Sequence, residues 1–175
     1  MSHWEGAGIS GSYAAFRPTY PAELYTTVLQ ELEANGVRRG GFLDLGCGSG
    51  QAFLPVARHF ERSFARDVSQ SQADACRAAV AKRFTADEAA QCDVGVGGAA
   101  DFNLPAGADG PTLDLITVAQ AMHWFPMQEF NAQLHRHLRP GGYFVTWLYG
   151  LNRLEPAGCD TELQAFDRML TEKTF

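Results

Sequence analysis

Short apolar runs of strand length alternate with segments of helical periodicity along most of this sequence. The strand-like runs are residues 41–45, 62–67, 92–96, 113–120 and 143–149. Helical spacing of apolar residues occurs at residues 21–36, 51–60, 69–84 and 127–142. Parallel neighbouring strands need a crossover helix between them, so this alternation predicts an α/β fold with a doubly wound, mostly parallel sheet.

The size and composition of the chain suit one globular domain. Of its 175 residues, 46% are hydrophobic and 19% are charged, which is enough apolar surface for a single core. A formal net charge of -6 leaves no excess of lysine and arginine to neutralise phosphates, and this disfavours nucleic-acid binding. No signal segment and no membrane-length apolar run is present, so we expect a cytoplasmic protein that does not enter a membrane.

Four cysteines are scattered along the sequence without the spacing of metal ligands. They are Cys47, Cys76, Cys92 and Cys159, and no pair of them forms a Cys-x-x-Cys motif. We therefore expect reduced thiols and no metal site.

A glycine turn follows the first predicted strand in the segment FLDLGCGSG at residues 42–50. Its glycines, Gly46, Gly48 and Gly50, do not follow the Gly-x-Gly-x-x-Gly pattern of nicotinamide-binding loops, nor is there the Gly-Lys-Ser/Thr of a P-loop. Asp44 would also repel a nearby phosphate. A nicotinamide oxidoreductase is therefore disfavoured, and the turn favours a nucleoside ligand whose tail is cationic or zwitterionic.

Two more acids follow the next two predicted strands. Asp67 ends the segment FARDVS, where a carboxylate can accept both hydroxyls of a ribose. Asp101 follows the third strand in AADF, where it could accept from the exocyclic amine of adenine. Three acids at successive strand ends outline one elongated ligand.

These segments together resemble a known motif series. FLDLGCGSG, FARDVS, AADF, LDLITVAQAMHWF and HLRPGGYF resemble the class I S-adenosylmethionine-dependent methyltransferases, over roughly residues 13–150. YAAFRPTYP and AQAMHWF are similar to the type 11, trans-aconitate methyltransferase-like branch. The resemblance implies a Rossmann-like sheet of order 3-2-1-4-5, with residues 1–40 as a lid segment and helix and 41–175 as the S-adenosylmethionine-binding domain.

The resemblance also implies roles for individual residues. The glycine turn would pack under the methionine part of the cofactor, with Asp44 near its ammonium group, and Cys47 would be an apolar filler rather than a nucleophile. Asp67 would hold the ribose. The complete set implied to contact S-adenosylmethionine is Asp44, Gly46, Cys47, Gly48, Gly50, Asp67, Val68, Ala100, Asp101, Ala119 and Gln120.

The methyl acceptor is expected to be a small molecule, possibly a carboxylic acid. Methyl transfer would be an in-line displacement that depends on positioning, so a dedicated base is not required. Arg17 is the candidate cation for a carboxylate, with Tyr13 and Tyr20 beside it; a segment that merely covers the sheet is the alternative. His123, the candidate catalytic residue, and Trp124 could orient the acceptor or take a proton, or could form a packed pair.

Two further expectations concern histidines and the end of the chain. We expect His135 and His137 on a solvated helix face and a helix at 160–171. The family continues after the fifth strand with a helix and an antiparallel hairpin, for which this sequence has no residues left. The fifth strand would then be an exposed edge, which suggests a truncated chain, a homodimer through that edge, or a catalytically silent cofactor-binding module.

Overall fold

A computed structural model describes residues 19–105 and 112–149 of the chain. Within them five strands form one sheet in the order β3-β2-β1-β4-β5, and every neighbouring pair is parallel. The strands are β1 (Gly41–Leu45), β2 (Arg62–Asp67), β3 (Cys92–Val96), β4 (Leu113–Ala119) and β5 (Leu138–Trp147). This arrangement confirms the predicted Rossmann-like sheet.

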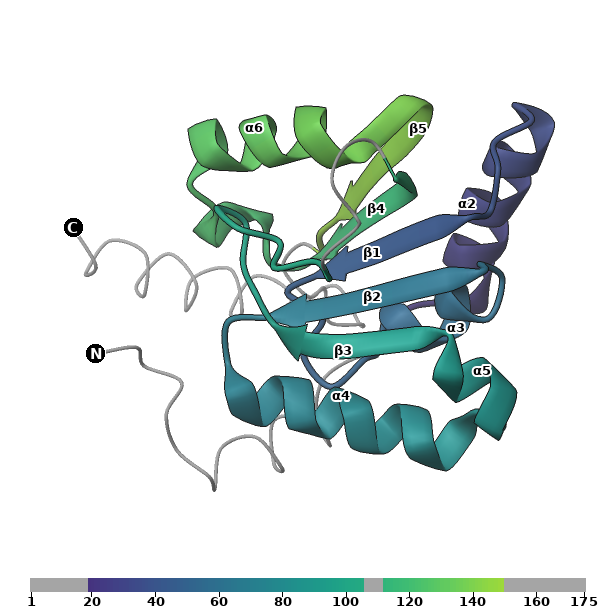
Figure 1. Cartoon of the computed structure of the whole chain (residues 1–175). Coiled ribbons are helices and arrows are strands. Elements are labelled where there is room, and N and C mark those ends of the chain that lie inside the picture. The colour runs from purple at the N-terminus through teal and green to yellow at the C-terminus, as the bar shows by residue number, and fades with distance from the viewer. Residues whose placement is uncertain (1–18, 106–111, 150–175) are drawn as a thin grey trace, which may run out of the picture.

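Helices flank both faces of the sheet (Figure 1). One apolar cluster joins Phe42 of the sheet to α2, α3 and α4, and its Phe42 and Phe53 rings stack at 5.8 Å. The opposite cluster joins Phe144 to α6 through Phe130, at 5.3 Å between ring centroids. The helices are α2 (Ala22–Ala34), α3 (Phe53–Ala57), α4 (Gln70–Arg83), α5 (Ala86–Ala90), η1 (Met122–Trp124) and α6 (Met127–His137).

The two central strands are buried along their whole length. Every residue of β1 and of β4 is buried, because each has a strand on both sides and helices over both faces. Burial of each large apolar side chain stabilises the fold by about 1.5–3 kcal/mol. This is why the two segments read as continuous apolar runs.

A buried acid fastens the end of the sheet that lies away from the glycine turn. Oδ2 of Asp114 accepts hydrogen bonds from the main-chain N–H groups of Gly40 and Gly41, both at 2.9 Å. Its Oδ1 lies 3.6 Å from Nη1 of Arg139. Asp114 therefore ties the starts of β1, β4 and β5 together.

The helix predicted at 127–142 ends earlier than expected. α6 stops at His137, because Leu138 already pairs with Leu113 in the sheet. The register then shifts between Leu113 and Leu115, and Pro140 lies in the irregular part of β5. Proline ends helices but is also tolerated at bulges in strands. The presence of Pro140 alone therefore did not distinguish the end of a helix from an irregular strand. β5 is the terminal strand among the described residues, and its pairing with a second copy stays a prediction.

Two side-chain and element predictions also need correction. His137 is not solvated: it is 7% exposed, and its ring centroid lies 5.5 Å from that of Phe102. His135 is exposed, as predicted. Helix α5 was missed, although Thr85 and Glu88 form the capping box that the Thr-x-x-Glu spacing indicates.

Candidate functional site

The carboxyl ends of the parallel strands point to one edge of the sheet (Figure 1). Doubly wound proteins bind their ligands beyond this edge. Here it carries the turn at 46–50 after β1, the end of β2 at Asp67, the loop at 97–105 and the segment that follows β4. The fold therefore brings together, at one edge of the sheet, candidate ligand-binding residues from four separate segments of the sequence.

The glycine turn has a backbone that only glycine adopts readily. Gly46, Gly48 and Gly50 have φ values of 67°, 53° and 89°. A Cβ atom on Gly46 would lie 2.5 Å from Cβ of Ala121, so the turn also lies close against the segment after β4. The main-chain N–H of Gly46 donates to the Arg66 carbonyl at 2.8 Å, which joins the turn to β2.

Asp44 lies under this turn as a buried acid. It is 1% exposed, and its Oδ1 accepts a hydrogen bond from Oγ1 of Thr117 at 2.6 Å. The two residues are register partners on β1 and β4. A buried carboxylate at this position can attract a positively charged group of a ligand.

Asp67, the last residue of β2, is a second acid at this edge, and its carboxylate is hydrogen-bonded to the glycine turn. Its Oδ2 accepts from the Gly48 N–H and its Oδ1 from the Ser69 N–H, both at 2.9 Å. Each carboxylate oxygen can accept a further hydrogen bond, so Asp67 can still bind a ligand hydroxyl. Ser69 is the N-cap residue of α4, but its side chain makes no capping hydrogen bond.

The loop after β3 is ordered by its own hydrogen bonds. Oδ1 of Asp101 accepts from the Asn103 N–H at 2.9 Å, and its carbonyl accepts from the Gly98 N–H at 2.9 Å. Asn103 has a φ of 48° and donates from Nδ2 to the Val96 carbonyl at 2.7 Å. Asp101 and Ala100 are exposed at this edge, where a ligand can reach them.

Val68 and Arg66 differ in role although both flank Asp67. Val68 is 77% exposed, and a Cβ on Gly98 would lie 3.0 Å from its Cγ1, so the two lie side by side. Arg66 is buried: its Nη1 lies 3.2 Å from Oδ1 of Asp93, and its Nε donates to the Asn103 carbonyl at 3.0 Å. Arg66 thus braces β2 against β3 and the next loop and is not an ion-pair partner of Asp67.

The residue after β4 is strained. Gln120 has a φ of 59°, a left-handed conformation that is uncommon for residues other than glycine. Its main-chain N–H donates to the Trp147 carbonyl at 3.0 Å, and the preceding residue, Ala119, is buried. Strain of this kind is concentrated at functional sites.

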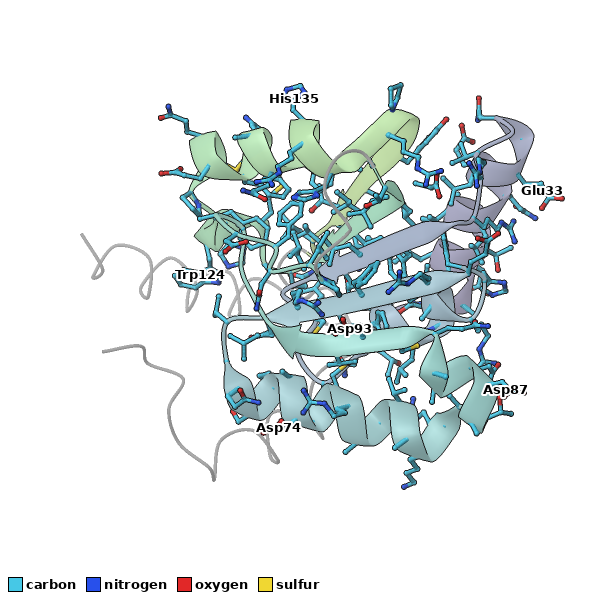
Figure 2. The ribbon with its side chains drawn as sticks, viewed as in Figure 1. Glu33, Asp74, Asp87, Asp93, Trp124 and His135 are labelled. Carbon is cyan, nitrogen blue, oxygen red and sulfur yellow. The ribbon has the colours of Figure 1, made fainter. Side chains whose placement is uncertain are left out.

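His123 and Trp124 lie on η1 at the outer rim of the edge. Trp124 is 71% exposed and projects away from the sheet in Figure 2. The His123 and Trp124 ring centroids lie 4.9 Å apart. The pair is therefore solvent-exposed and not packed in the core.

An aromatic group at this edge contains Tyr20, which was a candidate from the sequence, and Tyr25 and Trp147, which the sequence reasoning missed. The ring of Trp147 makes T-shaped contacts with the rings of Tyr20 and Tyr25, with centroids 5.6 and 6.4 Å apart. The Tyr25 hydroxyl donates to the Gln51 carbonyl at 3.0 Å. Burial, then Tyr20 and Asp44, raise the pKa of Tyr25 to about 12. No local sequence signal joins these residues, because Tyr20 precedes α2, Tyr25 lies in α2, Gln51 follows the glycine turn and Trp147 ends β5.

Cys47 has no sign of nucleophilic activation. A hydrogen bond with Cys76 and burial raise the pKa of the Cys47 thiol, so it stays protonated.

In the parts of the chain that the structure describes, no cluster of three metal-ligating side chains occurs. Over the same parts no helix is long and apolar enough to cross a membrane. Tyr13, Arg17, Cys159 and the helix predicted at 160–171 lie outside the described residues.

Comparison with known proteins identifies a family. Residues 43–146 match the family described as methyltransferase domain. A protein of Dictyostelium discoideum, named as a methyltransferase, is 34% identical over 146 residues, which cover 83% of this chain and 49% of the relative. CRG1 of Saccharomyces cerevisiae, named as a probable S-adenosylmethionine-dependent methyltransferase, is 24% identical over 80% of this chain and 45% of its own length. The chain thus spans about half the length of these curated relatives.

Solved structures agree with the family match. An Anaeromyxobacter dehalogenans protein described as a type II methyltransferase has a TM-score of 0.63 and 33% identity, covering 90% of this chain and 59% of that one. The glycopeptide N-methyltransferase MtfA, solved with sinefungin, has a TM-score of 0.57 and 21% identity, covering 82% of this chain and 52% of that one. The MtfA similarity concerns the fold alone.

Proposed function

The chain belongs to the methyltransferase domain family, and we propose that it transfers a methyl group from S-adenosylmethionine to a small-molecule acceptor. The observation that carries this proposal is the pairing of a buried acid, Asp44, with a glycine turn that Asp67 holds at the same edge. The turn at 46–50 contains no lysine or arginine, so it is poorly suited to a phosphate. A sulfonium-bearing amino acid matches the negative charge beneath it.

The remaining residues of the edge fit the nucleoside part of this cofactor. Asp67 would accept hydrogen bonds from the ribose hydroxyls with the lone pairs that Gly48 and Ser69 leave open. The exposed Val68 would lie against the adenine ring, and Asp101 would accept from the adenine amine. These assignments use groups that the fold already holds in place.

The two residues expected beside the acceptor, His123 and Trp124, are exposed. When bound, S-adenosylmethionine supplies an electrophilic methyl group on sulfur, which the acceptor displaces in line. We propose a carboxylic acid as the acceptor, as the likeness to the trans-aconitate methyltransferase-like branch implies. Such an acceptor is ionised at neutral pH and needs orientation more than a base. His123 and Trp124 would contact it at the rim.

Calorimetric titration with S-adenosylmethionine and S-adenosylhomocysteine tests the cofactor site. Wild-type chain should bind both ligands, and Asp67→Ala should weaken them about 10-fold to 100-fold, because hydrogen bonds to a charged group are lost. Asp74→Ala is the matched control, since Asp74 is an exposed acid on α4. A folded wild-type chain that binds neither ligand would refute the proposal.

A second candidate is a cofactor-binding module that does not transfer methyl groups. It is favoured by the exposure of His123, for which no orienting hydrogen bond is found among the described residues. Isotope-labelled S-adenosylmethionine incubated with a panel of carboxylic acids separates the two candidates. Labelled ester supports the enzyme; saturable binding without label transfer to any acid supports the module.

A further inference from the structure

A buried arginine fastens the loop at 97–105, which carries Asp101, to the sheet. The loop belongs to no helix or strand, so its shape depends on individual hydrogen bonds. Arg66, on β2, is 3% exposed, and burial of a guanidinium costs free energy unless its N–H groups are paired. The loop accepts one of these hydrogen bonds, from Nε of Arg66 to the Asn103 carbonyl at 3.0 Å.

The rest of the guanidinium is held by β2 and β3. Nη1 of Arg66 donates to the Asp93 carbonyl at 2.8 Å and to the Ala65 carbonyl at 3.0 Å. The same nitrogen lies 3.2 Å from Oδ1 of Asp93. Because the guanidinium is planar and rigid, these bonds also fix the direction in which Nε meets the loop.

Two glycines give this side chain its place. Gly95 is the register partner of Arg66 on β3, and a Cβ there would lie 3.6 Å from Nη1. A Cβ on Gly97 would lie 3.1 Å from Cδ of Arg66 and 2.9 Å from the Phe102 carbonyl. The Arg66 side chain therefore packs directly against the end of β3 and the first residue of the loop.

Asn103 links Arg66 to Asp101. Its φ of 48° is left-handed, a conformation that needs support from its surroundings. Its carbonyl accepts from Arg66, its Nδ2 donates to the Val96 carbonyl at 2.7 Å, and its main-chain N–H donates to Oδ1 of Asp101 at 2.9 Å. The direction of the Asp101 carboxylate thus depends on Arg66 through one intervening residue.

We infer that Arg66 is a positioning residue that sets the preference of the site for adenine. It acts through Asn103 and holds the Asp101 carboxylate where this accepts from the exocyclic amine of the base. This role rests on the proposed function, in which Asp101 contacts adenine. Hypoxanthine has a carbonyl oxygen in place of that amine, so it loses the hydrogen bond and faces the carboxylate with a second acceptor.

Paired calorimetric titrations with S-adenosylhomocysteine and S-inosylhomocysteine test this role, because the two ligands differ only in the base. Wild-type chain should bind S-adenosylhomocysteine roughly 10-fold or more tightly than S-inosylhomocysteine. Arg66→Met should reduce this ratio to less than about 3-fold, since the loop no longer directs Asp101 at the base. Arg66→Lys keeps the charge but not the planar set of donors, and it should give an intermediate ratio.

Two controls separate positioning from a general effect on the fold. Arg62→Met removes an exposed arginine at the start of the same strand and should change neither affinity. In an Asp101→Ala background, Arg66→Met should leave the ratio of the two affinities unchanged, because the residue through which it acts is absent. A further fall in the ratio there would overturn the role of Arg66.

The outcomes distinguish this role from the proposed function. A wild-type chain that binds neither ligand refutes the proposed function and the role of Arg66 with it. Equal wild-type affinity for both ligands overturns the role of Arg66 alone, because there is then no preference for adenine. Equal weakening of both ligands by Arg66→Met also overturns it, because Arg66 then supports the fold without directing Asp101. If Arg66→Met does not fold, an unchanged ratio in Arg66→Lys overturns the role and a reduced ratio supports it.

Discussion

Oδ2 of Asp67 accepts a hydrogen bond from the main-chain N–H of Gly48 at 2.9 Å, and this bond joins the end of β2 to the turn after β1. The other carboxylate oxygen accepts from Ser69 at the start of α4. Substitution of Asp67 therefore loosens the turn as well as any ligand contact. Substitutions at other residues of the site separate the stability of the turn from ligand binding.

Gly46→Ala should destabilise the chain more than Gly36→Ala. Both glycines have positive φ, 67° and 64°, but only at Gly46 would the new Cβ collide, 2.5 Å from Cβ of Ala121. We expect an extra loss of about 1–3 kcal/mol in the free energy of unfolding, measured by urea denaturation. Equal losses at both positions would show that the turn moves freely away from Ala121.

Thr117→Val should weaken the fold at Asp44. It removes the 2.6 Å hydrogen bond to a carboxylate that is 1% exposed, and the expected loss is about 1–3 kcal/mol in the free energy of unfolding. Thr146→Val is the comparison: at an exposed position of β5 it removes a 2.9 Å hydrogen bond to the neutral Val118 carbonyl and should cost less, about 0.5–1 kcal/mol. Thermal and urea unfolding of the two variants measure the difference; similar values for both would contradict it.

The Tyr25 phenol should ionise only at high pH. Its pKa in the folded chain is raised from 10.0 to about 12, so the folded state keeps a proton that the unfolded state loses first. The contribution to stability is therefore fully present below pH 10 and is lost as the pH rises through about 12. Ultraviolet titration of wild type minus Tyr25→Phe should show a midpoint near 12 while circular dichroism remains native. A midpoint near 10 in folded protein would contradict this.

Cys47 and Cys76 should resist alkylation at neutral pH. Both thiols are buried, and contact with Cys76 and burial raise the pKa of Cys47. Cys92, whose pKa burial raises to about 11, should also react slowly. Iodoacetamide treatment followed by peptide mass mapping measures each site, with urea-unfolded chain as the control. Labelling of Cys47 as fast as in the unfolded control would show that the glycine turn opens in solution.

The sequence predicted correctly those helices and strands whose pattern of apolar residues is compatible with only one type of secondary structure. The runs at 41–45 and 113–120 became β1 and β4, because uninterrupted apolar sequence suits strands buried on both faces. The helix predicted at 21–36 became α2. The helical spacing at 51–60 became α3, with Pro55 in its first turn. In these cases local preference and tertiary environment agree.

The predicted end of the helix at 127–142 was wrong, because its local sequence is compatible with both a helix and a strand. The segment around Pro140 suited either a helix end or a bulged strand, and pairing of Leu138 with Leu113 decided between them. The same pairing pulls the end of α6 onto the sheet, where His137 packs against Phe102. Leu113 and Phe102 are both distant in sequence from the residues that they contact, Leu138 and His137. A local sequence pattern therefore could not indicate either contact.

The sequence by itself determined the order of elements, the glycine turn and the acids Asp44 and Asp67, because these depend on residues close together in the chain. Only the tertiary structure decided that Asp67 holds Gly48, that Gln120 is strained against Trp147, and that Tyr25 joins Gln51 to β5. Strand order and register bring those residues together across long stretches of sequence. Hydrogen bonds between distant positions are set by that register, which neighbouring residues alone do not encode.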